Sequence, residues 1–183
     1  TYRFADRTHL PMPGAGVGLG AAAMGEAFGG QAAADWRALQ ERAGRMWATT
    51  RRPFLETPLT GARDLVPLAR DLAAVRTVAP WQTLRSLGRH TLSDWRARQV
   101  LDRYATYSGS DPRRAPAVLA TIPYIEATFG AWHIAGGLRS LGDALRARLD
   151  ERGVTVRLST PATRIELDSA GRVSGVRVAD GEV

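Results

Sequence analysis

The spacing of the apolar residues changes along the chain, and this change limits the possible folds more than any other feature. Before Gly153 the apolar residues mostly recur every three or four positions, as in amphipathic helices. After Gly153 they alternate with polar residues, as in strands that bury one face. The sequence therefore predicts an α+β fold in which a helical part is followed by a sheet.

Four amphipathic helices are predicted in the middle of the chain, joined by short links that contain proline or glycine. Their apolar stripes are Trp36, Leu39, Ala43, Met46 and Trp47; Leu65, Leu68, Leu72 and Val75; Trp81, Leu84 and Leu87; and residues 95–104. Asp35, Asp64 and Asp94 precede three of these stripes, and aspartate is a favourable N-cap residue. A fifth helix is predicted over residues 138–149, with Gly153 as its C-terminal cap.

Strands are predicted near both ends of the sequence. Residues 2–6 alternate like an edge strand, which Pro11 and Pro13 then end. Three more strands are predicted over residues 154–158, 165–167 and 173–178. The last two are joined by the turn at 168–171. Another turn is predicted at Asp180 and Gly181, close to the last residue of the sequence. We therefore expect the sheet to continue in a longer polypeptide.

The composition excludes several kinds of chemistry. All 25 cationic side chains are arginine, so no lysine can form a Schiff base. The chain has no cysteine, which excludes disulfides, thiolate nucleophiles and zinc–thiolate centres. Three histidines leave little for a histidine-rich site, and no metal is expected. No apolar run approaches the roughly 20 residues of a spanning helix, so we expect a cytoplasmic protein, at most peripheral at a membrane.

The basic charge is concentrated between residues 37 and 114. This segment holds 15 of the 25 arginines but only seven of the 18 acidic residues. Arginine and tryptophan together are compatible with nucleic-acid binding. However, acidic residues interleave with the arginines, and no cationic run is longer than a pair. Nucleic acid is therefore not an expected partner.

The same segment has two further interpretations. Four tryptophans lie in it or beside it: Trp36, Trp47, Trp81 and Trp95. Indole rings flanked by cationic side chains are typical of helices at a membrane surface. Alternatively, the tryptophans belong to the core and the arginines solvate the outer face. The sequence favours the core interpretation and leaves peripheral membrane contact open.

Residues 16–21 satisfy the relaxed dinucleotide-binding pattern G-x-G-x-x-A. Such glycines hold a pyrophosphate when a buried parallel strand delivers them to the start of a helix. Here Pro11 and Pro13 precede the glycines, and proline cannot donate the hydrogen bonds of a central strand. We therefore interpret residues 14–34 as a flexible connection rich in glycine and alanine.

His133 follows Trp132 and precedes the turn-like sequence Ala135-Gly136-Gly137. No carboxylate is positioned by the sequence to orient this histidine as a general base. The nearby acidic residues Asp143, Asp150 and Glu151 belong to the exposed face of the predicted helix. The residues alone therefore predict no catalytic constellation.

Short motifs follow one another in a specific order after residue 103. They are Gly109-Ser110-Asp111-Pro112, Ala115-Pro116-Ala117, Tyr124-Ile125-Glu126, Gly130-Ala131-Trp132, Gly136-Gly137-Leu138, Glu151-Arg152-Gly153-Val154, Thr160-Pro161-Ala162-Thr163-Arg164-Ile165 and the hairpin Gly171-Arg172-Val173-Ser174-Gly175-Val176. In this order they resemble the phytoene desaturase family, the FAD-dependent carotenoid desaturases within the amine-oxidase-like flavoproteins. The resemblance covers nearly the whole chain and is weakest over residues 13–31.

This resemblance implies a two-domain flavoprotein of which the chain is an internal fragment. Four parts are expected: residues 1–13, an edge-strand segment; residues 14–34, the connection; residues 35–130, a mainly helical substrate-side domain; and residues 131–183, an incomplete return to an FAD/NAD(P)-binding Rossmann-like α/β domain. The glycine-rich pyrophosphate loop and the final flavin-contacting segment of the family are missing. The isolated fragment is expected neither to hold FAD nor to be active.

The resemblance also implies site residues. Ala162 occupies the position whose backbone contacts the adenine of FAD, where the family has the larger valine. Gly136 and Gly137 match a diglycine that allows close approach to the flavin ring or its substrate. Trp132 and His133 match an aromatic pair that lines the substrate passage, with histidine replacing the usual second aromatic residue.

The implied activity is the dehydrogenation of an apolar polyene, a carotenoid precursor, by hydride transfer to flavin. The protein would then supply orientation and an apolar tunnel, because the flavin carries the chemistry. Two alternatives remain open at this point. One is an FAD-dependent amine-oxidase-like enzyme with another substrate, and the other is a non-enzymatic helical interaction module whose grooves bind partner helices.

Overall fold

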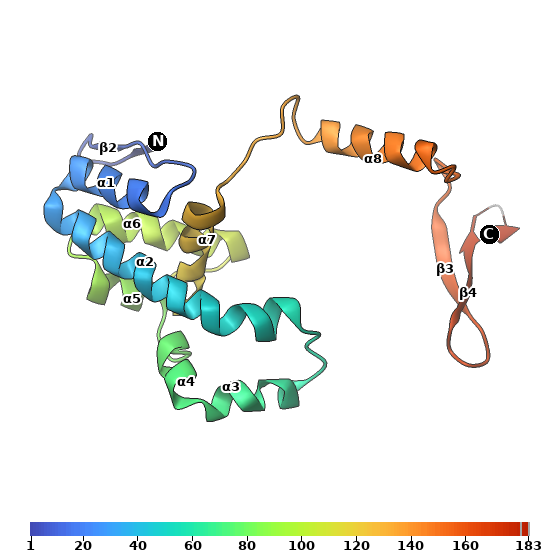
Figure 1. The fold of residues 1–183 in the computed structure, drawn as a ribbon, viewed down its shortest axis with the longest axis horizontal. Coiled ribbons are helices and arrows are strands. Elements are labelled where there is room, and N and C mark those ends of the chain that lie inside the picture. The colour runs from blue at the N-terminus through green and yellow to red at the C-terminus, as the bar shows by residue number, and fades with distance from the viewer. Residues whose placement is uncertain (180, 183) are drawn as a thin grey trace. The chain divides into compact units, whose positions relative to one another are not determined.

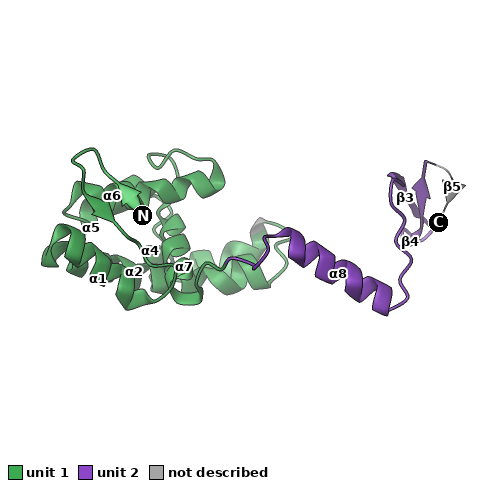
Figure 2. Ribbon diagram, turned by 90° about the horizontal axis from the view of Figure 1, so that it is seen from above, with its two compact units in different colours: residues 1–132 green, residues 133–183 purple. Residues whose placement is uncertain are grey.

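The computed structural model describes residues 1–179, 181 and 182. These residues form two units, residues 1–132 and residues 133–183 (Figure 2). Unit 1 contains an N-terminal hairpin and a group of helices, and unit 2 contains one helix and a small sheet (Figure 1). Both sheets of the described part are antiparallel. The predicted α+β class is confirmed, whereas the Rossmann-like domain and the predicted domain bounds remain predictions.

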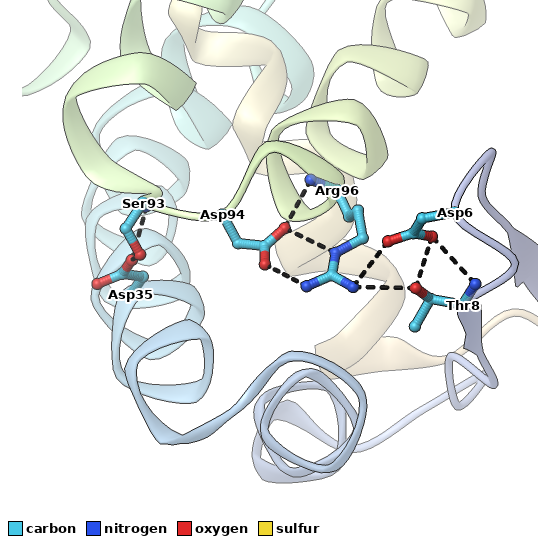
Figure 3. Close-up of polar contacts among 6 residues, drawn as sticks. All are labelled: Asp6, Thr8, Asp35, Ser93, Asp94 and Arg96. Carbon is cyan, nitrogen blue, oxygen red and sulfur yellow. Dashed lines mark hydrogen bonds and ion pairs between the residues drawn. The ribbon is translucent and has the colours of Figure 1, made fainter.

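Helix α2 (Gly30–Arg51) is the longest helix of unit 1. Its buried residues follow the predicted three- and four-residue spacing: Ala32, Trp36, Leu39, Gln40, Ala43 and Met46. Asp35 was predicted as the N-cap, and this is wrong because the helix begins five residues earlier, after Gly29 with its positive φ of 96°. The Asp35 carboxylate instead accepts hydrogen bonds from the Ser93 amide at 2.7 Å and the Ser93 hydroxyl at 2.6 Å (Figure 3).

Helix α1 (Val17–Phe28) occupies the segment that was predicted to be a flexible connection, and that prediction is wrong. The segment is rich in alanine, the strongest helix former, and its small residues allow close packing on α2. A β-carbon on Gly20 would lie 3.4 Å from the Trp36 Nε1 atom. The strand before the glycines of the dinucleotide-binding pattern is antiparallel, not a buried parallel strand. The Gly16 amide of that pattern donates to the Ala127 carbonyl at 2.7 Å and is therefore engaged within the protein.

The helix predicted over residues 65–75 is broken into shorter pieces. The structure has helical turns η1 (Arg52–Glu56) and η2 (Ala62–Leu65), followed by α3 (Val66–Arg70) and α4 (Leu72–Val78). Asp71 has an extended ψ of 97°, and its carboxylate accepts from the Ala73 and Ala74 amides. A new helix starts here because an N-cap aspartate satisfies the first free amides.

The remaining helical elements of unit 1 follow the predicted stripes more closely. They are α5 (Leu84–Thr91), α6 (Trp95–Arg103), η3 (Tyr104–Ser108), η4 (Ala117–Ala120) and α7 (Thr121–Phe129). Asp94 is the N-cap of α6 as predicted, since its carboxylate accepts from the Arg96 amide at 2.7 Å. Trp81 lies outside α5 and is 69% exposed, so its inclusion in that stripe is wrong.

The core of unit 1 lies between these helices and the N-terminal hairpin. Its largest fully buried side chains are Trp36, Leu10, Met24, Leu39, Met46, Leu84, Leu87, Leu92, Leu101 and Val100. Ala97, Ala105, Ala117 and Ala120 are also fully buried. Small residues at these positions let the helices approach one another, so that one continuous core forms.

The predicted N-terminal edge strand is instead a hairpin, β1 (Tyr2–Arg3) paired with β2 (His9–Leu10). Arg96 attaches this hairpin to the start of α6 (Figure 3). Its guanidinium group lies 2.7 Å from the Asp94 carboxylate, 3.1 Å from the Asp6 carboxylate and 2.9 Å from the Thr8 hydroxyl. The same group lies over the Phe28 ring at 4.2 Å. We call Arg96, Asp94, Asp6 and Thr8 the Arg96 cluster.

Unit 2 consists of α8 (Arg139–Glu151), β3 (Ala162–Leu167), β4 (Val173–Val178) and β5 (Gly181–Glu182). Gly153 has a φ of 66° after α8, and β3 and β4 form the predicted hairpin. The strand predicted over residues 154–158 is wrong, because no described strand lies beside it to complete its hydrogen bonds. The turn predicted at Asp180 lies partly outside the described residues.

Candidate functional site

An apolar pocket of about 260 Å³ lies within unit 1. It is lined by Trp47, Thr50, Phe54, Leu55, Val78, Val118, Thr121 and Ile125. These residues come from α2, η1, α4, η4 and α7, so five elements contribute to the lining of the pocket. The Trp47 and Phe129 rings meet edge to face beside it, with centroids 6.4 Å apart.

The two hydroxyl groups of this pocket are already used. Thr50 Oγ1 donates to the Met46 carbonyl and Thr121 Oγ1 donates to the Val118 carbonyl, both at 2.8 Å. The lining therefore offers mainly dispersion contacts and area for hydrophobic burial. A pocket of this chemistry is suited to an apolar ligand without hydrogen-bonding groups.

A basic apolar segment, residues 51–76, continues from this pocket. Its exposed large apolar side chains are Phe54, Leu55, Leu59, Val66 and Leu72. Its arginines, also exposed, are Arg51, Arg52, Arg63, Arg70 and Arg76. The Arg51 guanidinium group pairs with Glu56, while the Asp64 and Asp71 carboxylates accept from backbone amides. The segment therefore presents apolar side chains and cations on one surface element.

The tryptophans in and beside the basic region differ in burial, so some fit a core position and others remain available for membrane contact. Trp36 is 1% exposed and belongs to the core. Trp81 and Trp95 are 69% and 45% exposed, and Trp47 is half-buried at the apolar pocket. The core interpretation is thus correct for Trp36, and membrane contact remains a prediction for the exposed surface. Every helix of the described part is too short or too polar to cross a bilayer.

Trp132 and His133, predicted to line a substrate passage, lie where unit 1 ends and unit 2 begins. Trp132 is 84% exposed, and its Nε1 donates to the Phe129 carbonyl at 2.9 Å. Gly130 adopts a φ of 83°, and a β-carbon there would lie 2.8 Å from the indole. The indole position therefore depends on this glycine. His133 is exposed.

Gly136 and Gly137 form the turn that precedes α8. Their φ values are 81° and 85°, a backbone region that residues other than glycine rarely adopt. A β-carbon on Gly136 would lie 2.7 Å from Ser140 Oγ, whereas one on Gly137 would enter open space. The positive φ values favour glycine at both positions, and the flavin contact that the resemblance implies remains a prediction.

Ala162 begins β3, which is an outer strand of its sheet. It pairs with Val178 on one side, and its side chain is exposed. The other edge of β3 has no neighbouring described strand, so backbone groups there fit a contact to an adenine ring. Helix α8 has 13 residues and rises about 20 Å between Ala162 and the diglycine. No hydrogen bond or strand pairing joins Ala162 to the diglycine within the described residues, and the role of each position in an FAD site remains a prediction.

A polar cluster that the sequence did not predict connects η3 to α7. Tyr104 Oη donates to the Glu126 carboxylate at 2.7 Å, and Tyr107 Oη donates to its other oxygen. Burial and this hydrogen bond raise the pKa of Tyr104, and the hydrogen bond to Glu126 raises the pKa of Tyr107. Both phenols therefore remain protonated donors at neutral pH and tie these elements together. Glu126 stood in a recognised motif, but nothing in the sequence indicated its partners.

Gln40 lies beside this cluster, at a small cavity of about 30 Å³. It is 3% exposed, and its Oε1 atom is the buried side-chain oxygen without a hydrogen-bond partner in the described part. The cavity is large enough for one water molecule, and Glu126 also lines it. Within the described residues, no three acidic or histidine side chains gather as a metal site would require.

Comparison with known proteins gives relatives along most of the chain, although no protein-family model matches it. It is 38% identical over 156 residues to a hydroxyneurosporene desaturase of Cereibacter sphaeroides, covering 84% of this chain and 31% of that protein. It is 35% identical to a hydroxyneurosporene desaturase of Rubrivivax gelatinosus, covering 98% of this chain and 35% of that protein. A phytoene dehydrogenase of Streptomyces griseus is 31% identical over 98% of the chain and 34% of its own length. The chain thus spans about a third of the length of these curated relatives.

Proposed function

Because this chain belongs to the carotenoid desaturase-like family, we propose that it serves in an FAD-dependent oxidoreductase that dehydrogenates an apolar polyene. The observation that carries the proposal is the similarity to desaturases along nearly the whole chain. The family resemblance of the motifs after residue 103 is confirmed by these relatives. The apolar pocket of unit 1 adds independent support, because its lining matches the chemistry of such a substrate.

The role proposed for unit 1 is to bind and orient the polyene. A conjugated hydrocarbon offers no hydrogen-bonding groups, so shape and apolar area must hold it. The pocket beside Trp47 and Ile125 provides such a wall, and its threonine hydroxyls are occupied by backbone carbonyls. We propose that the side chains of Trp132 and His133 contact the substrate. Their exposure leaves both side chains free for that contact.

The role proposed for unit 2 is to contribute to the FAD site. Gly136 and Gly137 would admit the ring system against their bare backbone, and Ala162 would offer its backbone to the adenine. When bound, FAD supplies the hydride acceptor for the dehydrogenation. The residues of this chain would orient the substrate in apolar surroundings. The dehydrogenation also releases a proton, for which no acceptor is assigned among these residues.

The basic apolar segment is the part that we propose contacts a membrane. A water-insoluble polyene resides in a bilayer, and the segment borders the apolar pocket through Phe54 and Leu55. Exposed apolar side chains insert at the headgroup boundary, and arginines beside them attract anionic lipids. Membrane attachment at this point would place the pocket next to the source of its substrate.

Membrane contact is tested by sedimenting the protein with anionic and with neutral vesicles. We expect Leu55→Glu combined with Leu72→Glu to lower the affinity for vesicles at least about a hundredfold, because each change removes roughly 1.5–3 kcal/mol of apolar burial. The matched control is Leu19→Glu, an exposed leucine on α1 that lies outside the segment. Absence of the unaltered protein from both pellets would refute the membrane contact, and equal losses in variant and control would refute its placement.

The substrate assignment is tested by assaying the native polypeptide that carries these residues on a C40 polyene. Ile125→Asp puts a charge into the apolar pocket, and desolvation of that charge should reduce polyene turnover at least about tenfold. Ala22→Asp adds the same charge to an exposed position on α1 and should leave turnover within about twofold. Equal activities of the two variants would show that this pocket does not hold the substrate.

A further inference from the structure

A second hollow in unit 1 has the opposite chemistry to the apolar pocket. Its volume is about 310 Å³, and its lining consists of Thr83, Arg85, Ser86, Arg89, His90 and Arg113. Three guanidinium groups, one imidazole and two hydroxyls therefore surround one space. We call it the arginine hollow. It involves α5 and the loop at residues 111–116, and it includes none of the residues assigned above to substrate, flavin or membrane.

Backbone hydrogen bonds fix the two sides of the arginine hollow against each other. The Arg85 amide donates to the Pro112 carbonyl at 2.9 Å, and the Leu84 amide donates to the Ala115 carbonyl at 2.8 Å. Thr83 and Pro116 form an isolated antiparallel bridge. Asp111 organises the loop itself, since its carboxylate accepts from the Arg113 amide at 2.8 Å. These contacts fix the backbone of the loop that carries Arg113 against the start of α5.

The cations of the arginine hollow are only partly neutralised by the protein. Arg85 pairs with Asp102 at 2.8 Å. Within the described residues, the guanidinium groups of Arg89 and Arg113 have no carboxylate partner. Asp111 is the acidic residue nearest to Arg113 in sequence, but its carboxylate accepts a hydrogen bond from the Arg113 backbone amide. Like charges gathered in a concave site create a positive potential that attracts anions.

The donors of the hollow come mainly from its three arginines, with the Thr83 and Ser86 hydroxyls beside them. His90 Nδ1 lies 2.7 Å from the Ser86 carbonyl, and a carbonyl only accepts, so the proton on this nitrogen is already used within α5 and does not serve the hollow. Thr83 Oγ1 accepts from the Ser86 amide at 3.2 Å and keeps its own proton for donation. Guanidinium groups donate in a planar fork that matches two oxygens of a phosphate. A neutral or cationic ligand would find few acceptors here.

We propose that the arginine hollow binds a phosphate group. Arg89 and Arg113 would donate to its oxygens from opposite sides, with Arg85 and the Thr83 and Ser86 hydroxyls completing the contacts. The phosphate can come from a soluble phosphate ester or from the headgroup of an anionic lipid, because the recognised chemistry is the same. The proposal does not rest on polyene desaturation and would hold if the substrate were different.

The test uses the 183-residue chain with two probes, inorganic pyrophosphate in solution and phosphatidylcholine vesicles that contain phosphatidylglycerol. Arg113→Gln should weaken binding of at least one probe about tenfold, since one charge-assisted pair is lost. Arg114→Gln is the matched control, because Arg114 is the adjacent exposed arginine and does not line the hollow. Its binding should stay within about twofold of the unaltered chain. Arg113→Lys keeps the charge without the fork and should give an intermediate loss.

The two probes identify the source of the phosphate. Loss of pyrophosphate binding in Arg113→Gln supports a soluble ligand, and loss of vesicle binding alone supports a lipid headgroup. Circular dichroism and the unfolding midpoint confirm that each variant is folded. The proposal is overturned if the unaltered chain binds neither probe, or if Arg113→Gln and Arg114→Gln weaken binding equally, since diffuse charge would then explain the attraction.

Discussion

Units 1 and 2 contain the same kinds of elements but differ in what those elements bury. In α2 of unit 1, Leu39 is fully buried, whereas Leu145 in α8 of unit 2 is 59% exposed. Both leucines belong to apolar stripes with helical spacing. None of the described residues of unit 2 is buried, while unit 1 has a continuous core. An apolar pattern thus selects the local structure, but a packing partner decides how stable that structure is.

The elements of unit 2 are of a size that is unstable alone. A helix of 13 residues is marginal in water, and so is a small sheet without a buried apolar face. The exposed leucines of α8 and its N-cap position are Leu138, Leu141, Leu145 and Leu149. Under the proposed function, the remainder of a flavin-binding domain would cover this face. Unit 1 would then be a domain with its own core, and unit 2 would complete its core with the remainder of the flavin-binding domain.

Hydrogen exchange should show the largest contrast between the units. In the 183-residue chain, we expect amides of α2 and α6 to exchange at least about a thousandfold more slowly than those of α8, because their opening requires unfolding of the core. Exchange read by mass spectrometry or NMR measures this directly. Strong protection of α8 in a monomeric chain would break the comparison, since it would require packing that unit 2 does not show.

Leucine-to-alanine substitutions measure the same contrast as stability. Leu39→Ala removes a fully buried side chain and should lower the free energy of unfolding by about 2–5 kcal/mol. Leu145→Ala, on the exposed face of α8, should change it by less than about 0.5 kcal/mol. Urea unfolding of the two variants provides the comparison. Similar losses would show that α8 is packed as tightly as α2.

The Arg96 cluster should contribute to unit 1 by an intermediate amount. Arg96→Met removes its bonds to Asp94, Asp6 and Thr8 but keeps an apolar side chain over Phe28. We expect a loss of about 1–3 kcal/mol, because charge-assisted hydrogen bonds at a partly buried site are broken. Thermal unfolding provides the measurement. Arg98→Met is the control, since Arg98 lies on the same helix outside the cluster; an equal loss there would assign the effect to α6 itself.

Acid should reveal the smallest of these effects. The hydrogen bond from Arg96 lowers the pKa of Asp94 below the ordinary aspartate value, and the Thr8 contacts lower that of Asp6. A lowered pKa contributes stability above the unfolded-state value of about 3.9 and loses it as the pH falls through the folded-state value. Unit 1 should therefore lose stability between about pH 5 and pH 2. The slope should be shallower in Arg96→Met, and identical slopes would contradict this origin.

The sequence predicts elements well where one local signal decides the outcome. Asp94 as an N-cap, the hairpin of β3 and β4, and Gly153 after α8 depend on residues within a few positions of each other. These features are present because capping and turn formation are local. The glycine-rich α1 could not be predicted, since its helix is stabilised by close packing on Trp36 of α2.

The candidate site was less accessible to sequence reasoning than the fold. The wall of the apolar pocket brings Trp47 near Val78 and Ile125, which are far apart in sequence. The arginine hollow likewise joins Arg89 to Arg113 through backbone contacts of an irregular loop. The spacing of apolar residues describes one helix or strand at a time and cannot show which residues far apart in sequence lie together. The roles of Gly136, Gly137 and Ala162 came from family resemblance and stay predictions.

The most direct test of the proposed function is an absorption spectrum combined with a substrate assay. The native polypeptide that carries these residues is purified, its spectrum is recorded, and it is incubated with a C40 polyene in liposomes. We predict flavin absorption bands and a shift of the polyene spectrum to longer wavelength, as each dehydrogenation extends the conjugated system. A colourless protein that leaves the polyene unchanged would contradict the account and favour a helical interaction module.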